Sequence, residues 1–146
     1  MTPRAFLDVA GEWAVGTHEA EWRSAVSRAY YAAFHTARNL LELCGFTVPP
    51  ADQAHAYLWL RLSNASHPDV VQVGHDLQYL RRVRNGADYD IAQAFPQALA
   101  VKQVELASGI VDLLENVPTL PTVLARITAA IQAYERDVLK QVTWRP

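Results

Sequence analysis

Apolar side chains recur at steps of three and four residues along the segment 18–44, and this pattern restricts the fold more than any other feature of the chain. The spacing places them on one face of an α-helix. Alanines in the middle of the stripe would let a neighbouring helix approach closely. Gly45 is the expected end, because glycine readily adopts the left-handed conformation of a helix C-terminus. The stripe consists of Trp22, Val26, Ala29, Ala33, Ala37, Leu40 and Cys44.

The same periodicity runs through most of the chain, and no alternating apolar–polar run predicts a half-buried strand. Prolines and helix caps divide the pattern. We expect helices over about residues 3–15, 18–44, 51–62, 68–85, 95–117 and 122–142. The predicted fold class is all-α: an up-and-down bundle of four to five helices plus an extra C-terminal helix.

A chain of 146 residues is expected to form one domain, residues 1–146. Residues 118–146 are interpreted as the additional C-terminal helix. Its apolar stripe must pack against the bundle or against a partner. That stripe contains Leu120, Leu124, Ile127, Ile131, Tyr134 and Val138.

The net charge of −2 argues against general electrostatic binding of nucleic acid by the whole protein surface. The sequence still allows a local basic patch, since all but two of the 13 basic residues are arginines and three of these cluster at Arg81, Arg82 and Arg84. The one cysteine, Cys44, excludes an intramolecular disulfide. No apolar stretch is long enough to cross a membrane, and the expected location is the cytoplasm.

Arg84 occupies a position where the helical pattern calls for a core residue, in line with Leu77 and Leu80. A guanidinium stays charged, so its burial requires an anion or several acceptors. Asp88, four residues further on, is the candidate partner. On the segment 18–44, a polar ridge lies opposite the apolar stripe; it contains Arg28, Tyr31, His35, Arg38 and Glu42.

Two segments together resemble the HEPN family, in particular its small stand-alone prokaryotic members. The first is residues 27–35, with the pair Tyr30-Tyr31 followed by Phe34-His35. The second runs from Leu77 into Arg-Asn-Gly-Ala-Asp-Tyr-Asp at 84–90. Between them, His55 looks like the histidine that these proteins often carry before a short helix. The core of the resemblance spans residues 17–117.

The resemblance implies a helical bundle that commonly dimerises. Active HEPN ribonucleases pair an arginine with a histidine about four to six residues further on, and two such motifs meet across a dimer. The family also includes toxins encoded beside a nucleotidyltransferase partner, and members that only bind nucleotide or RNA. Accordingly, we expect a homodimer and consider a nucleotidyltransferase-type partner protein.

Arg84 matches the arginine of that motif, but Asp88, Tyr89 and Asp90 fill the places of the histidine. An imidazole can act as acid and base near neutral pH. Tyrosine titrates near pH 10 and aspartate near pH 4, so neither replaces it without a large shift. The degenerate motif therefore argues against RNA cleavage at this position.

The favoured prediction is a protein that binds RNA or nucleotide, or a partner protein, in a toxin–antitoxin or defence type system. Arg84 and Arg81 would contact phosphate and Asp88 would orient Arg84, with Tyr89 and Tyr31 completing the binding set. The alternative for these residues is a structural cluster that pins the helix 68–85 to the helix 18–44.

A second hypothesis is a metal-independent endoribonuclease that uses Arg84, or Arg28 with His35, since six residues separate Arg28 from His35. Arg61 and His67 have a similar spacing but are expected to straddle a helix end. A third hypothesis is a non-catalytic dimeric interaction module. We expect no cofactor and no metal, because the few His and Asp fragments lack a second pair at zinc-ligand spacing.

Overall fold

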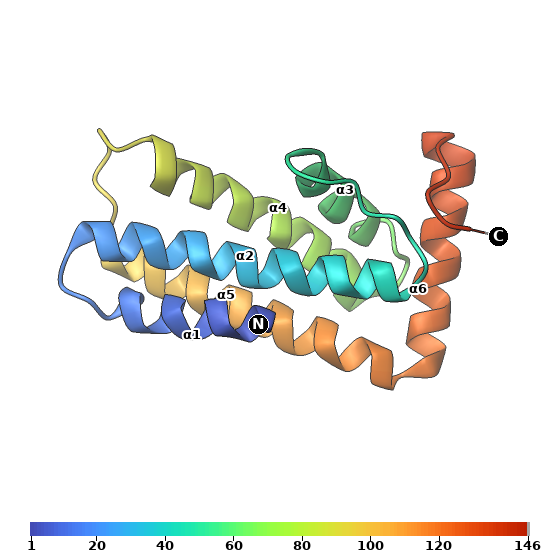
Figure 1. Ribbon diagram of the computed structural model, residues 1–146, viewed down its shortest axis with the longest axis horizontal. Coiled ribbons are helices and arrows are strands. Elements are labelled where there is room, and N and C mark those ends of the chain that lie inside the picture. Colours follow the sequence, from blue (N-terminus) through green and yellow to red (C-terminus); the bar gives the residue numbers. More distant parts are fainter. Residues whose placement is uncertain (146) are drawn as a thin grey trace.

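Six α-helices contain most of residues 1–145, which are the residues that the computed structural model describes (Figure 1). Within residues 1–145 there is no strand, and the one β-type pairing is an isolated bridge between Phe46 and Trp144. The all-α prediction is therefore confirmed. The helices are α1 (Pro3–Ala14), α2 (Glu19–Leu43), α3 (Gln53–Leu62), α4 (Pro68–Tyr89), α5 (Gln97–Asn116) and α6 (Pro121–Tyr134).

Helix α2 is the central element of the bundle (Figure 1). It packs against α1, α4 and α5, and these four helices run along the long axis of the molecule. The short helix α3 packs mainly on α4. Helix α6 crosses one end of the bundle, so the C-terminal helix closes the core instead of extending it.

The small-residue stripe of α2 is buried as the sequence predicts. Ala29, Ala33 and Ala37 are completely inaccessible to solvent, as is Val26. Because alanine side chains are short, three neighbouring helices can approach the α2 backbone from different sides. The opposite ridge stays half-buried or exposed, from Arg28 to Glu42.

The end of α2 follows the glycine signal in the sequence. Gly45 has φ 96°, in the left-handed region. The Gly45 N–H donates to the Glu42 carbonyl and the Phe46 N–H donates to the Leu41 carbonyl, both at 3.0 Å. This pair of hydrogen bonds forms the Schellman motif, which satisfies carbonyls that the helix leaves free. The turn directs Phe46 back into the core.

Helix α4 reaches Tyr89, a little beyond the predicted end near residue 85. Its last carbonyls find a donor in Arg23 of α2, whose guanidinium donates to the Ala87 and Asp90 carbonyls at 2.9 and 3.2 Å. Arg23 also bonds to the Gln93 carbonyl in the following loop. Ile91 lies beyond the helix end and is exposed.

The predicted helix to residue 142 is wrong at its C-terminal end. Helix α6 ends at Tyr134 and continues as a π-helical turn, Glu135–Leu139. The chain then reverses at Lys140, which has φ 55°, and the Thr47 N–H donates to the Thr143 carbonyl at 2.9 Å. The predicted stripe is therefore buried only within the helix: Ile127 and Ile131 are buried, whereas Leu120 before α6 and Val138 in the π-helical turn are exposed.

A buried ion pair holds this C-terminal segment to α3. Arg61 Nε lies 2.7 Å from Glu135 Oε2, and the two side chains are 4% and 0% exposed. Thr143 donates to the same carboxylate through its N–H and its hydroxyl, at 2.9 and 2.7 Å. The Tyr57 ring lies under the guanidinium, with 3.5 Å from the Arg61 Cζ to the ring centroid. Each charge therefore has partners, which a buried pair requires.

We predict that Glu135→Gln destabilises the fold by about 3–5 kcal/mol, because it leaves the buried Arg61 charge without its counter-ion. The double variant Arg61→Met with Glu135→Leu should recover most of this loss, since it removes both charges. Urea denaturation measures the free energy of unfolding. Arg136→Ala, which removes an exposed pair with Asp137, is the control and should change little. A Glu135→Gln variant as stable as the parent would contradict the prediction.

Candidate functional site

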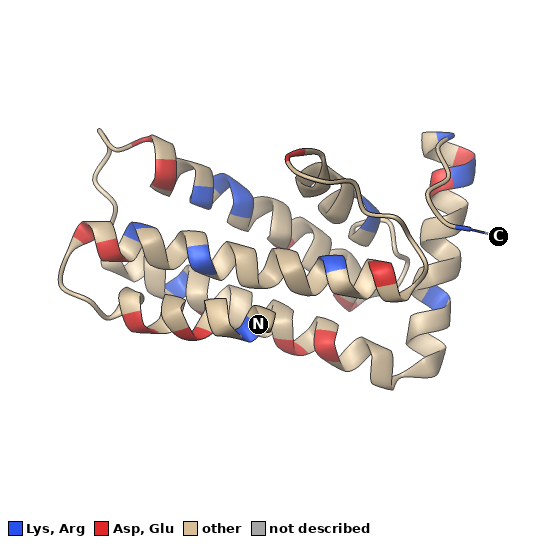
Figure 2. Cartoon of the chain, in the orientation of Figure 1, with Lys and Arg blue, Asp and Glu red and all other residues tan. Residues whose placement is uncertain are grey.

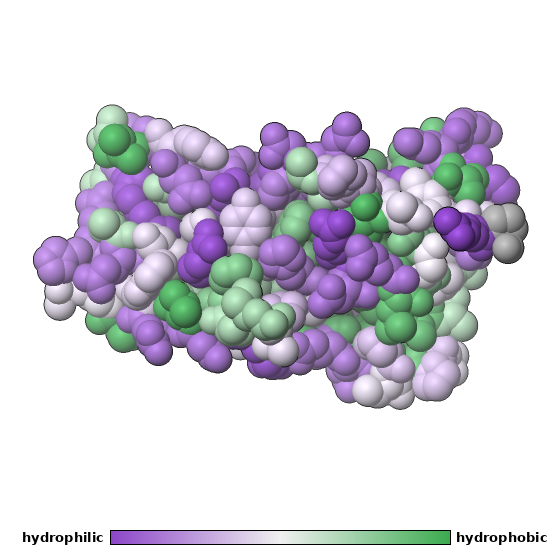
Figure 3. All heavy atoms as spheres, viewed as in Figure 1, coloured by the Kyte–Doolittle hydropathy of each residue, from purple (hydrophilic) through white to green (hydrophobic). Residues whose placement is uncertain are grey.

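Five side chains from the facing ridges of α2 and α4 form what we call the arginine–tyrosine face: Arg28, Tyr31, Arg81, Arg84 and Asp88. Helical spacing aligns the first two on α2 and the last three on α4. Figure 2 shows the basic segments of α4 beside a basic segment of α2. In Figure 3 the surface over these two helices is mostly hydrophilic, with paler and apolar side chains among the polar ones.

Tyr31 lies between two guanidinium groups. The Arg28 Cζ is 5.3 Å and the Arg84 Cζ is 5.2 Å from the centroid of the Tyr31 ring. Both distances are within the range of cation–π attraction. The aromatic ring therefore brings two positive charges near one another on a half-buried surface.

Asp88 is the anion nearest to Arg84, as its position four residues further along the helix suggests. Arg84 Nε lies 2.8 Å from Asp88 Oδ2, in an ion pair whose N–H is not aligned as a hydrogen bond. Ser27 Oγ donates to the same oxygen at 3.4 Å, and Arg28 donates to Ser27 Oγ at 3.4 Å. The sequence did not predict this link between α2 and α4.

The positive charge of this face exceeds its negative charge. Arg28, Arg81 and Arg84 meet one carboxylate, Asp88, and within residues 1–145 neither Arg28 nor Arg81 forms an ion pair. The Arg81 Nε atom is buried and has no hydrogen-bond partner in the same part of the chain. An uncompensated guanidinium at a half-buried position favours an external anion.

Beneath the face, Tyr30 and His55 form a buried pair that joins α2 to α3. The Tyr30 hydroxyl shares a hydrogen bond of 2.5 Å with His55 Nδ1, and the two rings stack at 5.6 Å. Burial lowers the pKa of His55, and the positive charges of Arg81 and Arg84 lower it further, against a smaller opposing effect of Asp52. Burial likewise raises the pKa of Tyr30. Both groups are therefore neutral at pH 7.

His35 and Arg28 meet on Phe6 of α1, a contact that the sequence reasoning missed. The His35 and Phe6 rings stack at 5.7 Å with an interplanar angle of 15°, and the Arg28 Cζ lies 5.1 Å from the Phe6 centroid. Burial lowers the pKa of His35, and the charges of Arg38 and Arg28 add to that effect. His35 and Asn39 also line a pocket of about 200 Å³ beside the first residues of α1.

Tyr89 is at the edge of the arginine–tyrosine face, on the last turn of α4. It is 74% exposed, and the Arg84 Cζ is 5.7 Å from its ring centroid. Unlike Tyr31, it is therefore accessible over most of its ring. The structure thus gathers all seven predicted site residues on one side of α2 and α4, with His35 at the α1 edge.

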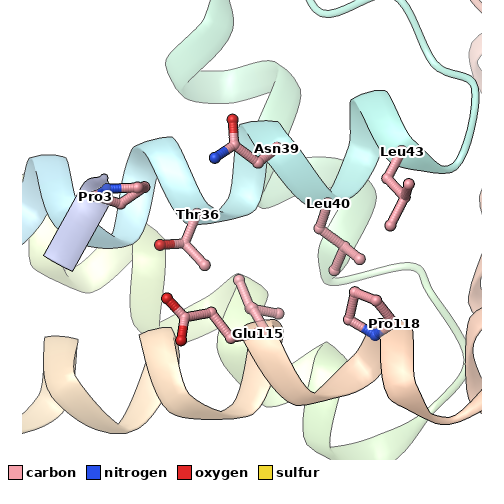
Figure 4. A pocket seen from close by; sticks show the side chains of 8 residues that line it. Pro3, Thr36, Asn39, Leu40, Leu43, Glu115 and Pro118 are labelled. Atoms are coloured by element: carbon pink, nitrogen blue, oxygen red, sulfur yellow. The ribbon is translucent and has the colours of Figure 1, made fainter. Parts of the chain in front are cut away.

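A second pocket of about 220 Å³ lies between α1, α2 and α5 and shares Pro3 and Asn39 with the pocket beside His35 (Figure 4). Its walls are mainly apolar, including Leu40, Leu43 and Pro118, with Thr36 and Glu115 at one side. Glu115 is already paired with Arg4 at 2.9 Å. The pocket offers shape and apolar surface but no free charged group at its wall.

Within residues 1–145, no group of three or more His, Cys, Asp or Glu side chains is placed to hold a metal ion. None of the helices in this part of the chain has the length and apolar character needed to cross a membrane.

Comparison with known proteins gives no relative: no family model, no curated protein and no solved structure matches this chain.

We predict that His35 titrates below the ordinary histidine value near 6.5, and that Arg38→Gln and Arg28→Gln each move its pKa upward, because each removes a nearby positive charge. NMR titration of the imidazole resonances measures this. With its pKa lowered in the folded state, His35 binds protons more readily in the unfolded chain than in the folded one below about pH 6.5. His35 therefore lowers the free energy of unfolding as the pH falls through that region. The control, Arg126→Gln on α6, should leave the His35 pKa unchanged; an unshifted His35 would contradict the prediction.

Proposed function

We propose that this protein is HEPN-like and binds RNA or a nucleotide through the arginine–tyrosine face, as a component of a defence or toxin–antitoxin type system. The observation that carries this proposal is the excess of guanidinium groups around Tyr31, with Arg28 and Arg81 lacking ion pairs within residues 1–145. The resemblance of segments 27–35 and 77–90 to the HEPN family supports the same proposal.

The chemistry of the face suits a phosphate group. Arginine presents several N–H donors in a planar fork that matches phosphate oxygens. Asp88 holds Arg84 at 2.8 Å and so limits its rotation, while its single charge leaves two of the three guanidinium charges uncompensated. A protein with a net charge of −2 thereby presents a local positive surface.

Aromatic side chains would supply the second part of the contact. A base of the ligand can stack on the exposed ring of Tyr89, next to the guanidinium of Arg84. Tyr31, being half-buried between two arginines, would position them and make less contact itself.

Binding is proposed here instead of cleavage because the residues around Arg84 offer no accessible imidazole. His55 lies near Arg81 and Arg84, but it is only 7% exposed and its Nδ1 is bonded to Tyr30. Asp88 is held in an ion pair with Arg84.

Arg84→Ala and Arg81→Ala should each weaken binding of a labelled single-stranded RNA by about tenfold or more, because each removes a charge-assisted contact to phosphate. Fluorescence anisotropy at two salt concentrations measures affinity and its salt dependence. The matched control is Arg82→Ala, an exposed arginine between the two in sequence, which should bind nearly as the parent does.

Circular dichroism of each variant separates loss of binding from loss of fold. If Arg84→Ala unfolds, Arg81→Ala and Arg84→Lys test the ligand contact with the fold retained. Equal weakening in all three single alanine variants would indicate general electrostatics. Unchanged affinity in Arg81→Ala and in a folded Arg84 variant would overturn the proposal and favour the structural role of the cluster.

A second candidate function is metal-independent RNA cleavage by Arg28 and His35. The observation in its favour is their convergence on Phe6, with His35 kept neutral near pH 7 by its lowered pKa. A neutral imidazole can accept a proton from an attacking hydroxyl, and a guanidinium can stabilise negative charge on phosphorus oxygens.

If His35 is catalytic, RNA cleavage should persist with a chelator and fall by at least about a hundredfold in His35→Ala, the usual size of a general acid–base contribution. Gel electrophoresis of a mixed RNA pool measures it. Arg38→Ala, on the same ridge, is the control. The absence of cleavage in the parent protein would rule this function out and leave the binding proposal standing.

A further inference from the structure

A groove runs between α4 and α5, along the N-terminal half of α4 and away from Arg84 in its C-terminal half. It has a volume of about 280 Å³. Its floor is apolar and is formed by Val73, Leu106, Ile110 and Leu113. Val73 and Ile110 belong to the core, whereas Leu106 and Leu113 are half-buried and face the opening. The proposed function makes no use of this surface.

Carboxylates line the sides of this α4–α5 groove. They are Asp69, Asp76 and Glu105, and no lysine or arginine lines it. Within residues 1–145 none of the three forms an ion pair. Lys102, the one base of α5, does not line the groove.

Two of these charges have a stabilising interaction within α4. Asp69 stands in the first turn of α4, where a negative charge is stabilised by the helix dipole. Asp76 accepts a hydrogen bond from Gln72 Nε2 at 2.9 Å, four residues before it. Glu105, in the middle of α5, stands beside the apolar floor without such a local role in the fold.

Gly109 keeps the groove open on the α5 side. It is exposed, and a Cβ placed on it would meet no atom within 4 Å. Glycine inside an α-helix costs stability relative to alanine, so the fold itself does not favour it there. Its lack of a side chain leaves room above Leu106 and Leu113.

We propose that the α4–α5 groove docks a basic amphipathic helix of a partner protein, with its apolar side on the leucine floor and its Lys or Arg side chains against Asp69, Asp76 and Glu105. An apolar groove takes the apolar face of a helix through side chains at i, i+3, i+4 and i+7. Three uncompensated carboxylates select a positive partner and speed its association. This partner surface is independent of the proposed RNA or nucleotide site.

The test uses the full chain and a labelled synthetic peptide with leucine at i, i+3, i+4 and i+7 and lysine elsewhere. A matched peptide carries glutamate in place of lysine. The groove variant is Asp69→Asn, Asp76→Asn and Glu105→Gln combined. Its control neutralises three exposed acids elsewhere, Asp8→Asn, Glu12→Gln and Asp52→Asn, so both proteins change by the same net charge.

Fluorescence anisotropy should show binding of the lysine peptide that is weakened roughly tenfold in the groove variant and little changed in the control. Gly109→Leu, which adds a side chain at a position where a Cβ meets no atom within 4 Å, should weaken binding by a similar factor while circular dichroism shows an intact fold. The glutamate peptide should not bind.

Four results would each overturn the proposal. Equal weakening in the groove and control variants would mean general attraction to an acidic protein. Undiminished binding to Gly109→Leu, or no binding of the lysine peptide to the parent protein, would show that the groove is not the docking site. Sedimentation showing a dimer that Gly109→Leu dissociates would mean that a second copy of this chain covers the groove.

Discussion

The close packing around α2 is the constraint on which the rest of the structure depends. Ala29, Ala33 and Ala37 present almost no side-chain volume, so α1, α4 and α5 can all pack directly on one helix. This approach also brings the polar edges of the helices together. Arg28 and Tyr31, at the border of the buried stripe, meet Arg84 of α4 because the two backbones lie so near. A larger residue at one of these alanine positions would push the neighbouring helices away from α2. The core would then pack less closely, and Arg28 and Tyr31 would move away from Arg84.

Three arginines serve three different purposes in this bundle, and burial explains each. Arg23 donates to carbonyls at the end of α4, where the helix leaves acceptors free. Arg61 is enclosed with Glu135 and fastens the C-terminal segment. Arg84 is partly covered and pairs with Asp88, but it shares its surroundings with Arg28 and Arg81, which have no ion pairs within residues 1–145. The arginine–tyrosine face is therefore the place where positive charge exceeds what the fold requires.

A small net charge conceals this separation of charge on α4. The C-terminal half of the helix carries Arg81 and Arg84, and its N-terminal half carries Asp69 and Asp76 beside Glu105 of α5. Screening in salt solution weakens the interaction between opposite charges that are kept apart in this way. The two surfaces can thus attract different partners, an anionic ligand on one side and a cationic helix on the other.

The sequence by itself determined the helices, the glycine end of α2, the buried alanine stripe and the pairing of Arg84 with Asp88, because each depends on residues within a turn or two of one another. Tertiary structure alone decided that Arg61 meets Glu135, that Phe6 brings Arg28 and His35 together, and that the last helix ends at a π-helical turn before residue 142. Helical periodicity reports which side of a helix is buried but not which distant residue lies against it. Those partners depend on how whole helices pack. Contacts between residues far apart in the chain produce no regular spacing in the sequence from which they could be predicted.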